Sequence, residues 1–565
     1  MILGIDLGTT NSLISYFSEK GPVIIPNRLG DNLTPSIVSI DENEQIYVGK
    51  IAKERKVIYP DYTAEVFKRN MGTKKIYKLG NKEFLAEELS SFIIRSLKED
   101  AEAFLGQTVE EAVISVPAYF NDSQRKATCR AGELAGVKVE RVISEPTAAA
   151  IAYGLQNKKL ETKFLVFDLG GGTFDVSVLE VYENVMEVRA VAGDNFLGGE
   201  DFTDILINMF FKERNIDENT LDRKTLAHIK KQAEICKFGF VNARTSSMKC
   251  KINDEFIEYD ISIDEYEKSC QLLLAKIRKP IERALSDAAI KVKEIDEIIL
   301  VGGATKLSII RNFVGKLFGM LPNTHINPDE TVAVGAAIQG AMKERNKAIS
   351  EIILTDVCPY TIGTNVSVQK QGDYYESGHF FPIIERNTVI PVSRTERLYT
   401  VYDNQSEIRV EVLQGESRLV KNNLYLGEII VPVQRKKAGE EAIDVTYTYD
   451  INSILEVEVT VVSSSLKKRI VIEKEEGNMS KGEIEARLEE LKELKILPKD
   501  REENKLLLSM GERLYEESIG EIREKLDLSI RHFEHVLDKQ DRLEVEKTAR
   551  KLKAFFDEIE ASDLL

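Results

Sequence analysis

The pattern of apolar and polar positions divides the chain of 565 residues into segments with three different periodicities. From residue 1 to about 350, short apolar strands alternate with amphipathic helical stretches. One stretch places Leu89, Phe92 and Leu97 at helical spacing, and an apolar strand at residues 112–116 follows it. This alternation predicts an α/β domain over residues 1–349, with helices packed on sheets.

The segment at residues 357–477 has a period of two. Two stretches show this alternation clearly, with apolar residues at Ile408, Val410 and Val412 and at Val457, Val459 and Val461. Strands with one buried and one solvated face predict a β-sandwich.

A docking linker and a helical end complete the predicted organisation. Residues 350–356 contain three consecutive apolar residues, which favours a linker that docks over a solvated spacer. After residue 477, Ser480 and Glu483 have the spacing of a capping box, and further helical runs begin near residues 500, 519 and 541. Asp541 and Glu544 repeat the cap spacing at the start of the last run. The sequence therefore predicts a small helical bundle over residues 478–565, with charged and solvated faces.

Composition and charge exclude several classes of function. The hydrophobic content of 43% supports buried cores in a multidomain protein. A net charge of -17 argues against a nucleic-acid binder or a protein of anionic membranes, because such a surface repels phosphate groups. No apolar run approaches the ~18 residues of a membrane span. The five scattered cysteines are expected to be buried free thiols, and we expect a soluble, cytoplasmic protein without a leader.

Two glycine-bearing hairpins carry the strongest signal. Residues 6–11 read Asp-Leu-Gly-Thr-Thr-Asn, and residues 168–175 read Asp-Leu-Gly-Gly-Gly-Thr-Phe-Asp. Each follows an apolar strand, and turns without side chains let backbone N–H groups approach phosphate oxygens. One such hairpin would fit a tight turn without a ligand equally well, but two matching copies predict two halves of one phosphate clamp. The sequence contains no Walker-type loop, so the clamp must have another design.

The order of further motifs resembles one known family, the seventy-kilodalton heat-shock chaperones of the DnaK type. The resemblance covers nearly the whole chain and rests on six motifs, at residues 4–12, 116–122, 145–150, 167–176, 198–202 and 301–305. The shorter C-terminal end and the divergent linker are more similar to the HscC-type branch. The resemblance implies a multidomain α/β, β and α architecture: an actin-like (ribonuclease-H-like) two-lobed ATPase domain, a β-sandwich peptide-binding domain and a helical lid.

The resemblance also implies roles for individual residues in ATP hydrolysis. The implied catalytic residues are Lys68, Glu145, Asp168 and Thr173, and Asp6 and Asp175 would hold Mg²⁺ through its waters. Spacing alone would favour a surface Lys-Arg pair at residue 68. Four buried carboxylates also need a cation on electrostatic grounds, with K⁺ as a further candidate ion. The implied contacts to ATP or ADP are Gly8, Thr9, Thr10, Asn11, Gly170, Gly171, Gly172, Gly198, Gly199, Glu234, Lys237, Gly302, Gly303, Lys306 and Asp329.

The adenosine end departs from the family's pattern. Val241 stands where the family has a serine, and Lys306 stands where an arginine is expected to stack on adenine. A lysine has no planar guanidinium face. We therefore expect a weaker nucleotide affinity than in typical members of the family.

Three positions would couple the domains or meet partners. The resemblance assigns Pro117 to a proline switch, Arg125 to an arginine relay, and Arg141 to contact with J-domain co-chaperones. Thr355 interrupts the usual leucine-rich linker, so we expect weaker coupling between the two sites. The shortened segment at 237–262 leaves use of the usual nucleotide-exchange factor open, and the C-terminus lacks the acidic tetrapeptide that recruits repeat-domain co-chaperones.

In the β domain, four residues align with the family's peptide channel: Leu398, Val401, Ile408 and Val410. The alternating pattern at Ile408 and Val410 fits ordinary sandwich core equally well. Val401 is larger than the alanine common in the family, and Thr364 replaces an apolar residue, so the preference among unfolded or client polypeptides is expected to differ.

We interpret the sequence as that of an ATP-dependent molecular chaperone. Two alternative functions are compatible with the same ATPase fold. An actin-fold sugar kinase predicts a small-molecule phosphoryl acceptor, and a filament-forming actin relative predicts nucleotide-dependent polymerisation. Neither alternative gives a role to residues 357–565.

Overall fold

The computed structural model describes residues 1–154, 161–182, 185–252, 255–323, 325–344, 353–369, 375–450, 455–472, 498–518 and 520–561. The chain forms two compact units, Met1–Pro359 and Tyr360–Leu565. The finer boundaries at residues 349, 356 and 477 stay predictions. The capping box predicted at Ser480 and Glu483 lies outside the described residues.

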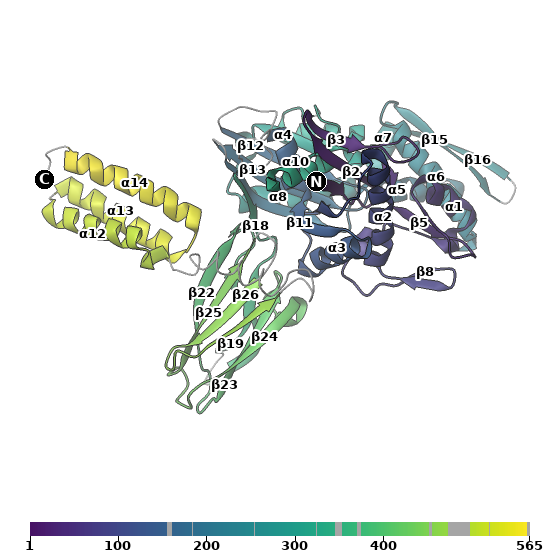
Figure 1. Cartoon of the computed structure of the whole chain (residues 1–565). Coiled ribbons are helices and arrows are strands. Elements are labelled where there is room, and N and C mark those ends of the chain that lie inside the picture. The colour runs from purple at the N-terminus through teal and green to yellow at the C-terminus, as the bar shows by residue number, and fades with distance from the viewer. Residues whose placement is uncertain are drawn as a thin grey trace. The chain divides into compact units, whose positions relative to one another are not determined.

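The first unit contains two sheets built on the same plan, and we call each sheet with its helices a lobe (Figure 1). The first lobe has the strand order β11-β10-β1-β2-β3, over Lys138–Ser144, Glu111–Val116, Ile2–Asp6, Asn11–Ser18 and Gly21–Ile25. The second lobe has the order β17-β12-β13-β14-β18, over Glu297–Val301, Glu161–Leu169, Phe174–Tyr182, Val185–Asp194 and Ile353–Val357.

Each lobe has a central strand with one parallel and one antiparallel neighbour. Strand β1 pairs with β10 in parallel and with β2 antiparallel, and β12 pairs with β17 and β13 in the same two ways. The two glycine-bearing hairpins predicted from the sequence therefore join equivalent strand pairs, β1–β2 and β12–β13.

Amphipathic helices and short strands complete the first unit. The predicted stripe of Leu89 and Leu97 lies on α2 and is buried in the core of the first lobe. The helices are α1 Lys50–Ile58, α2 Ala86–Leu105, α3 Asp122–Leu134, α4 Glu145–Gly154, α5 Gly199–Arg214, α6 Arg223–Gly239, α7 Ile263–Ser269, α8 Gln271–Asp287, α9 Ser308–Phe318 and α10 Thr331–Lys343. The short strands are β4 Thr34–Pro35, β5 Ile37–Ile40, β6 Ile46–Val48, β7 Thr63–Glu65, β8 Tyr77–Leu79 and β9 Lys82–Phe84. A hairpin of β15 Thr245–Ile252 and β16 Glu255–Ser262 projects from one end of this unit (Figure 1).

Helix α10 packs so closely against α4 and β1 that no side chain fits between the backbones at two glycines. A Cβ atom at Gly335 would lie 1.8 Å from the carbonyl oxygen of Ala148, and a Cβ atom at Gly4 would lie 2.2 Å from the backbone nitrogen of Ala337. Only glycine permits such an approach.

The second unit begins with two four-stranded sheets, ordered β20-β19-β23-β24 and β22-β25-β26-β27. The hydroxyl of Tyr447 on β25 donates to the carbonyl oxygen of Gly363 on β19 at 3.2 Å, which joins the two sheets. Val410 and Val457 are buried, as the period-two pattern predicts. The strands of this unit are β19 Ile362–Gln369, β20 Tyr375–Ile384, β21 Val389–Ile390, β22 Val392–Tyr399, β23 Glu407–Gln414, β24 Leu424–Pro432, β25 Ala442–Tyr449, β26 Leu455–Val461 and β27 Lys467–Ile472.

Three helices end the chain: α12 Glu502–Glu517, α13 Gly520–Asp538 and α14 Arg542–Ala561. They share a core that contains Leu514, Phe533 and Phe556. The cap predicted for the last helix is present, because the backbone N–H of Glu544 donates to Asp541 Oδ1 at 3.0 Å. Within the described residues, no helix combines the length and apolar character needed to cross a membrane.

Candidate active site

An open cavity lies between the two lobes and is lined by the hairpins of both. Most residues predicted to act on or bind the nucleotide line it: Asp6, Gly8, Thr9, Thr10, Asn11, Lys68, Glu145, Asp168, Gly170, Gly171, Thr173, Gly199, Glu234, Lys237, Gly302, Gly303, Lys306 and Asp329. Gly172, Gly198 and Asp175 are not part of the lining. Asp175 is buried beneath it, opposite Asp168 in the β12–β13 ladder.

The two hairpins meet so closely that side chains would not fit between them. A Cβ atom at Gly171 would lie 1.6 Å from Thr10 Oγ1, and a Cβ atom at Gly172 would lie 2.4 Å from Thr9 Cγ2. The Thr10 hydroxyl is buried, and no described residue forms a hydrogen bond with it. A buried hydroxyl left without a partner beside bare backbone fits the oxygens of a bound phosphate.

A buried ion pair and three further carboxylates lie below the hairpins. The Nζ atom of Lys68 is 2.7 Å from Glu145 Oε1, and only 3% of the Lys68 side chain is exposed. Lys68 is therefore no surface residue. Asp6 Oδ1 accepts a hydrogen bond from Ser115 at 2.7 Å, and Asp175 Oδ1 accepts one from the backbone N–H of Tyr119 at 3.1 Å.

Negative charge in this cluster exceeds what Lys68 can neutralise. Burial, together with the charge of Glu145, raises the pKa of Asp6 to about 7 and that of Asp175 to about 8. The same causes raise the pKa of Asp168 well above its usual range. Among described side chains, no group of three or more His, Cys, Asp or Glu is placed to ligate a metal directly. A bound cation would neutralise the remaining negative charge of these carboxylates. That this cation is Mg²⁺, held through its waters, stays a prediction.

The other end of the cavity is built by α6 and by the 3₁₀ turn η5 (Gly303–Lys306). Lys306 forms an ion pair with Asp329. Lys237 is buried, which lowers its pKa, and its Nζ atom donates to the Gly199 carbonyl oxygen at 2.9 Å and to Thr203 Oγ1 at 2.7 Å.

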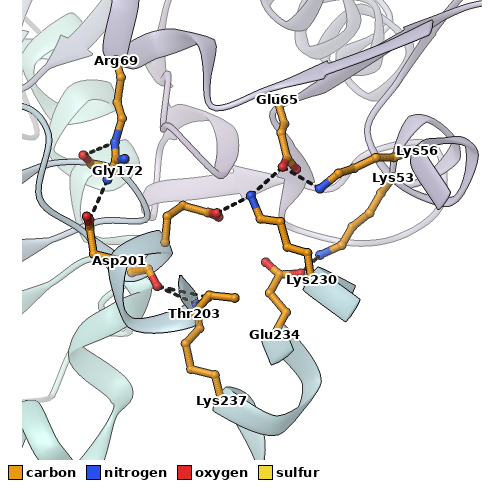
Figure 2. A network of polar contacts seen from close by, with 12 residues as sticks. Lys53, Lys56, Glu65, Arg69, Gly172, Asp201, Thr203, Lys230, Glu234 and Lys237 are labelled. Carbon is orange, nitrogen blue, oxygen red and sulfur yellow. Dashed lines mark hydrogen bonds and ion pairs between the residues drawn. The ribbon is translucent and has the colours of Figure 1, made fainter. Parts of the chain in front are cut away.

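Beside the cavity, a set of ion pairs joins the two lobes (Figure 2). Lys230 on α6 contacts Glu65 on β7 at 2.8 Å and Glu200 on α5 at 2.7 Å, and Lys56 contacts Glu65 at 2.5 Å. Burial alone would raise the pKa of Glu65, but the charges of Lys230 and Lys56 lower it to about 2. We call Lys56, Glu65, Glu200 and Lys230 the bridge cluster.

Two further contacts cross between the lobes near the bridge cluster. Lys53 pairs with Glu234 at 3.1 Å. Arg69 donates from Nε to the Gly172 carbonyl oxygen at 2.6 Å and from Nη2 to Asp201 at 2.9 Å (Figure 2). These pairs were not predicted from the sequence, because residues far apart in the chain give no local signal of an ion pair.

The predicted coupling residues lie outside the cavity lining. Arg125 on α3 donates from Nε to the carbonyl oxygen of Phe120 at 3.1 Å and from Nη2 to that of Ala118 at 3.2 Å. These carbonyls belong to the loop that follows Pro117, and the same loop contacts Asp175 through Tyr119. Arg141 lies on β11, half-buried and opposite Val113.

The linker contributes a strand to the first unit, and the predicted peptide contacts lie on or next to strands of the second unit. Strand β18 pairs in parallel with β14, with Glu187 opposite Thr355, so this part of the linker docks in the first unit. In the second unit, Leu398 lies one residue before the end of β22 and Val401 lies two residues after it, both half-buried. Ile408 and Val410 are buried on β23 in the other sheet. Their role in peptide binding stays a prediction.

Comparison with known proteins identifies the family. A family model described as Hsp70 protein matches residues 2–78 and 74–564. The chain belongs to the Hsp70 family. The protein named Chaperone protein DnaK of Thermotoga petrophila is 40% identical over 510 residues, covering 87% of this chain and 83% of the relative. The protein of the same name of Thermosipho melanesiensis is 38% identical over 582 residues, covering 99% of this chain and 95% of the relative.

Membership in the Hsp70 family confirms three predictions from the sequence: the family itself, function as an ATP-dependent chaperone, and ATPase activity. The two lobes, the paired sheets and the terminal helices are consistent with the architecture that the family implies. The comparisons give no support to a sugar kinase. The HscC-type branch stays a prediction.

Proposed function

We propose that the chain binds ATP in the cavity between its lobes and hydrolyses it, and that the nucleotide state controls binding of extended hydrophobic peptides by the β-sandwich. The observation that carries this proposal is the meeting of two glycine-bearing hairpins over the buried Lys68–Glu145 pair. Family membership supports the same conclusion.

In this proposal, the phosphate end performs the hydrolysis. The hairpin N–H groups and the Thr9 and Thr10 hydroxyls hold the β- and γ-phosphates, and Lys68 stabilises charge that spreads over the γ-phosphoryl group. Glu145 and Asp168 orient the attacking water. Mg²⁺, held through its waters by Asp6 and Asp175, would neutralise phosphate charge when bound.

The structure offers a route from the cavity toward the linker. Asp175 contacts the loop at 117–121, and Arg125 holds two carbonyls of that loop. The linker strand β18 is paired to β14, two strands from β12 in the same sheet. A change in the relative position of the lobes would alter how well β18 pairs, and this difference is what couples the sites.

We also propose unfolded or client polypeptides and a J-domain co-chaperone as partners, with Arg141 on β11 in the surface that the co-chaperone contacts. Leu398, Val401, Ile408 and Val410 are the residues proposed to contact the peptide.

The proposal is tested by the release of a labelled hydrophobic peptide after addition of ATP. Wild-type chain is expected to release the peptide on ATP addition. The Lys68→Ala variant should still release it on ATP binding but should fail to recapture it as hydrolysis proceeds. Release that does not depend on nucleotide would overturn the coupled mechanism.

A further inference from the structure

A second, smaller pocket lies beside the cavity and has no role in the function described so far. It has a volume of about 30 Å³, which is room for about two waters or one small ion. Among the described residues, four lysines line it: Lys53, Lys56, Lys230 and Lys231. We call it the lysine pocket.

The lysine pocket and the cavity share a wall. Thr9 and Thr10, in the hairpin proposed to hold the β- and γ-phosphates, line both. The Thr10 hydroxyl is buried and forms no hydrogen bond with a described residue. At the other side of the pocket, the side chains of Lys53 and Lys231 are 37% and 35% exposed. The lysine pocket therefore extends from the phosphate end of the cavity toward solvent.

The charges that line the two spaces differ in sign. Among the described lining residues, the cavity has six carboxylates and three lysines, whereas the lysine pocket has four lysines and three carboxylates. Lys231 pairs with Glu54, which lies outside the lining and is 71% exposed, so this ion pair neutralises Lys231 only weakly. An anion set free in the cavity is thus repelled there and attracted toward the lysine pocket.

The bridge cluster closes the lysine pocket between the lobes. All four of its members line the pocket. Figure 2 shows the ammonium groups of Lys56 and Lys230 directed at the carboxylate of Glu65. An ion larger than water can pass only when these contacts open.

The wall near the hairpin contains a backbone conformation that is easily lost. Val66 lines the lysine pocket and lies between Glu65 and the 3₁₀ turn η2 (Phe67–Asn70), which carries Lys68. Its φ is 57°, in the left-handed region that a β-branched residue rarely adopts. The ion pairs of Glu65 on one side and the buried Phe67 and Lys68 on the other hold it there. Opening of the ion pairs would let this wall relax.

We propose that the lysine pocket is the exit site for the orthophosphate that hydrolysis releases, while ADP stays in the cavity. This inference rests on the proposed function and assigns a separate path to one of its products. After cleavage, orthophosphate passes the Thr10 hydroxyl and is attracted by the lysine ammonium groups. It reaches solvent beside Lys53 and Lys231 when the bridge cluster opens.

Three separate measurements on the full chain test the proposal. In a single turnover, quenched flow reports cleavage of ATP and a fluorescent phosphate-binding sensor protein reports free orthophosphate. Release of a fluorescent ADP analogue is measured from a complex formed without phosphate. Val57 on α1 lines the lysine pocket. In Val57→Phe the larger side chain fills the pocket, so the delay between cleavage and free orthophosphate is expected to lengthen about 5-fold or more, with cleavage and ADP release unchanged.

Ile58→Phe is the matched control, because Ile58 is the next residue of α1, is 54% exposed, and does not line the pocket. Val57→Ala widens the pocket and should not lengthen the delay. Equal delays in Val57→Phe and Ile58→Phe would overturn the exit site. An equal slowing of orthophosphate and ADP release would overturn it too, because it would show a common path. Absence of cleavage in the wild-type chain would instead overturn the proposed function.

Charge gives an independent readout that does not depend on filling the pocket. Lys231→Met removes one pocket cation, and it should lengthen the delay about 2- to 5-fold at low salt. This difference from wild type should shrink at high salt, because salt screens the attraction. Lys224→Met, at an exposed position of α6 outside the pocket, is the control and should match wild type. An unchanged delay in Lys231→Met at low salt would contradict attraction of phosphate by the pocket.

Discussion

The ammonium of Lys68 lies 2.7 Å from the carboxylate of Glu145, although the two residues are 77 positions apart in the chain. Both side chains are buried between the lobes, where opposite charges interact more strongly than in water. The pair holds the lysine where two glycine-bearing hairpins meet. In the proposed mechanism, the pair thus fixes in advance the ammonium that stabilises charge on the phosphoryl group.

Replacing Lys68 should abolish most of the ATPase activity. In Lys68→Ala, single-turnover hydrolysis of ATP is expected to fall by about 10²- to 10³-fold, because a fixed charge in a buried site is lost. ATP affinity should change much less. Lys74→Ala, at an exposed position six residues away, is the control and should hydrolyse ATP like wild type. Hydrolysis retained in Lys68→Ala would contradict the assigned role.

Breaking the bridge cluster should speed nucleotide release. Lys230→Met removes the cation that contacts Glu65 in one lobe and Glu200 in the other. We expect release of a fluorescent ADP analogue to become about 10-fold faster in stopped-flow measurements, which corresponds to about 1.4 kcal/mol.

The control for Lys230 is Arg223→Ala, which removes another ion pair of α6 with the first lobe. Arg223 and its partner Asp61 are both largely exposed, with side-chain exposures of 76% and 57%, so this pair is expected to contribute little. Equal acceleration in both variants would show that burial of the bridge cluster is irrelevant to release.

Stability should depend on pH through Glu65. Its pKa is lowered from 4.5 to about 2 in the folded chain, so its contribution is complete above about pH 4.5 and is lost as the pH falls toward about 2. Glu65→Gln should lower the thermal unfolding midpoint of the first unit at pH 7, and this difference from wild type should shrink at pH 3. An equal difference at both pH values would argue against an ionised Glu65.

Local signals in the sequence predicted the hairpins well, because glycines and strand ends act within a few residues. The cap of α14 and the docking of residues 353–355 were also visible from short patterns. Ion pairs between residues far apart in the chain could not be predicted in this way. Nothing near Glu65 indicates that Lys230 will meet it, since a charge on an amphipathic helix is usually solvated.

Disrupting the linker strand should uncouple the two units. Thr355→Pro removes a backbone amide from β18 and is unfavourable in a paired strand. We expect ATP-triggered peptide release to slow by about 10-fold, with hydrolysis of ATP in the absence of peptide unchanged. Thr355→Val is the matched control. Its hydroxyl is buried and bonds to no described residue, so valine should preserve the strand. Fast release in Thr355→Pro would show that the pairing of β18 does not carry the signal.

The glycine contacts of α10 have a consequence for how the lobes can move. The chain passes from the first sheet to the second through α4, and α10 lies against α4 and β1 with only bare backbone between them at Gly335 and Gly4. Sliding along this contact would bring larger neighbours into gaps that admit no side chain. We therefore expect the contact of α10 with α4 to act as a pivot, about which the two lobes rotate rather than slide past each other.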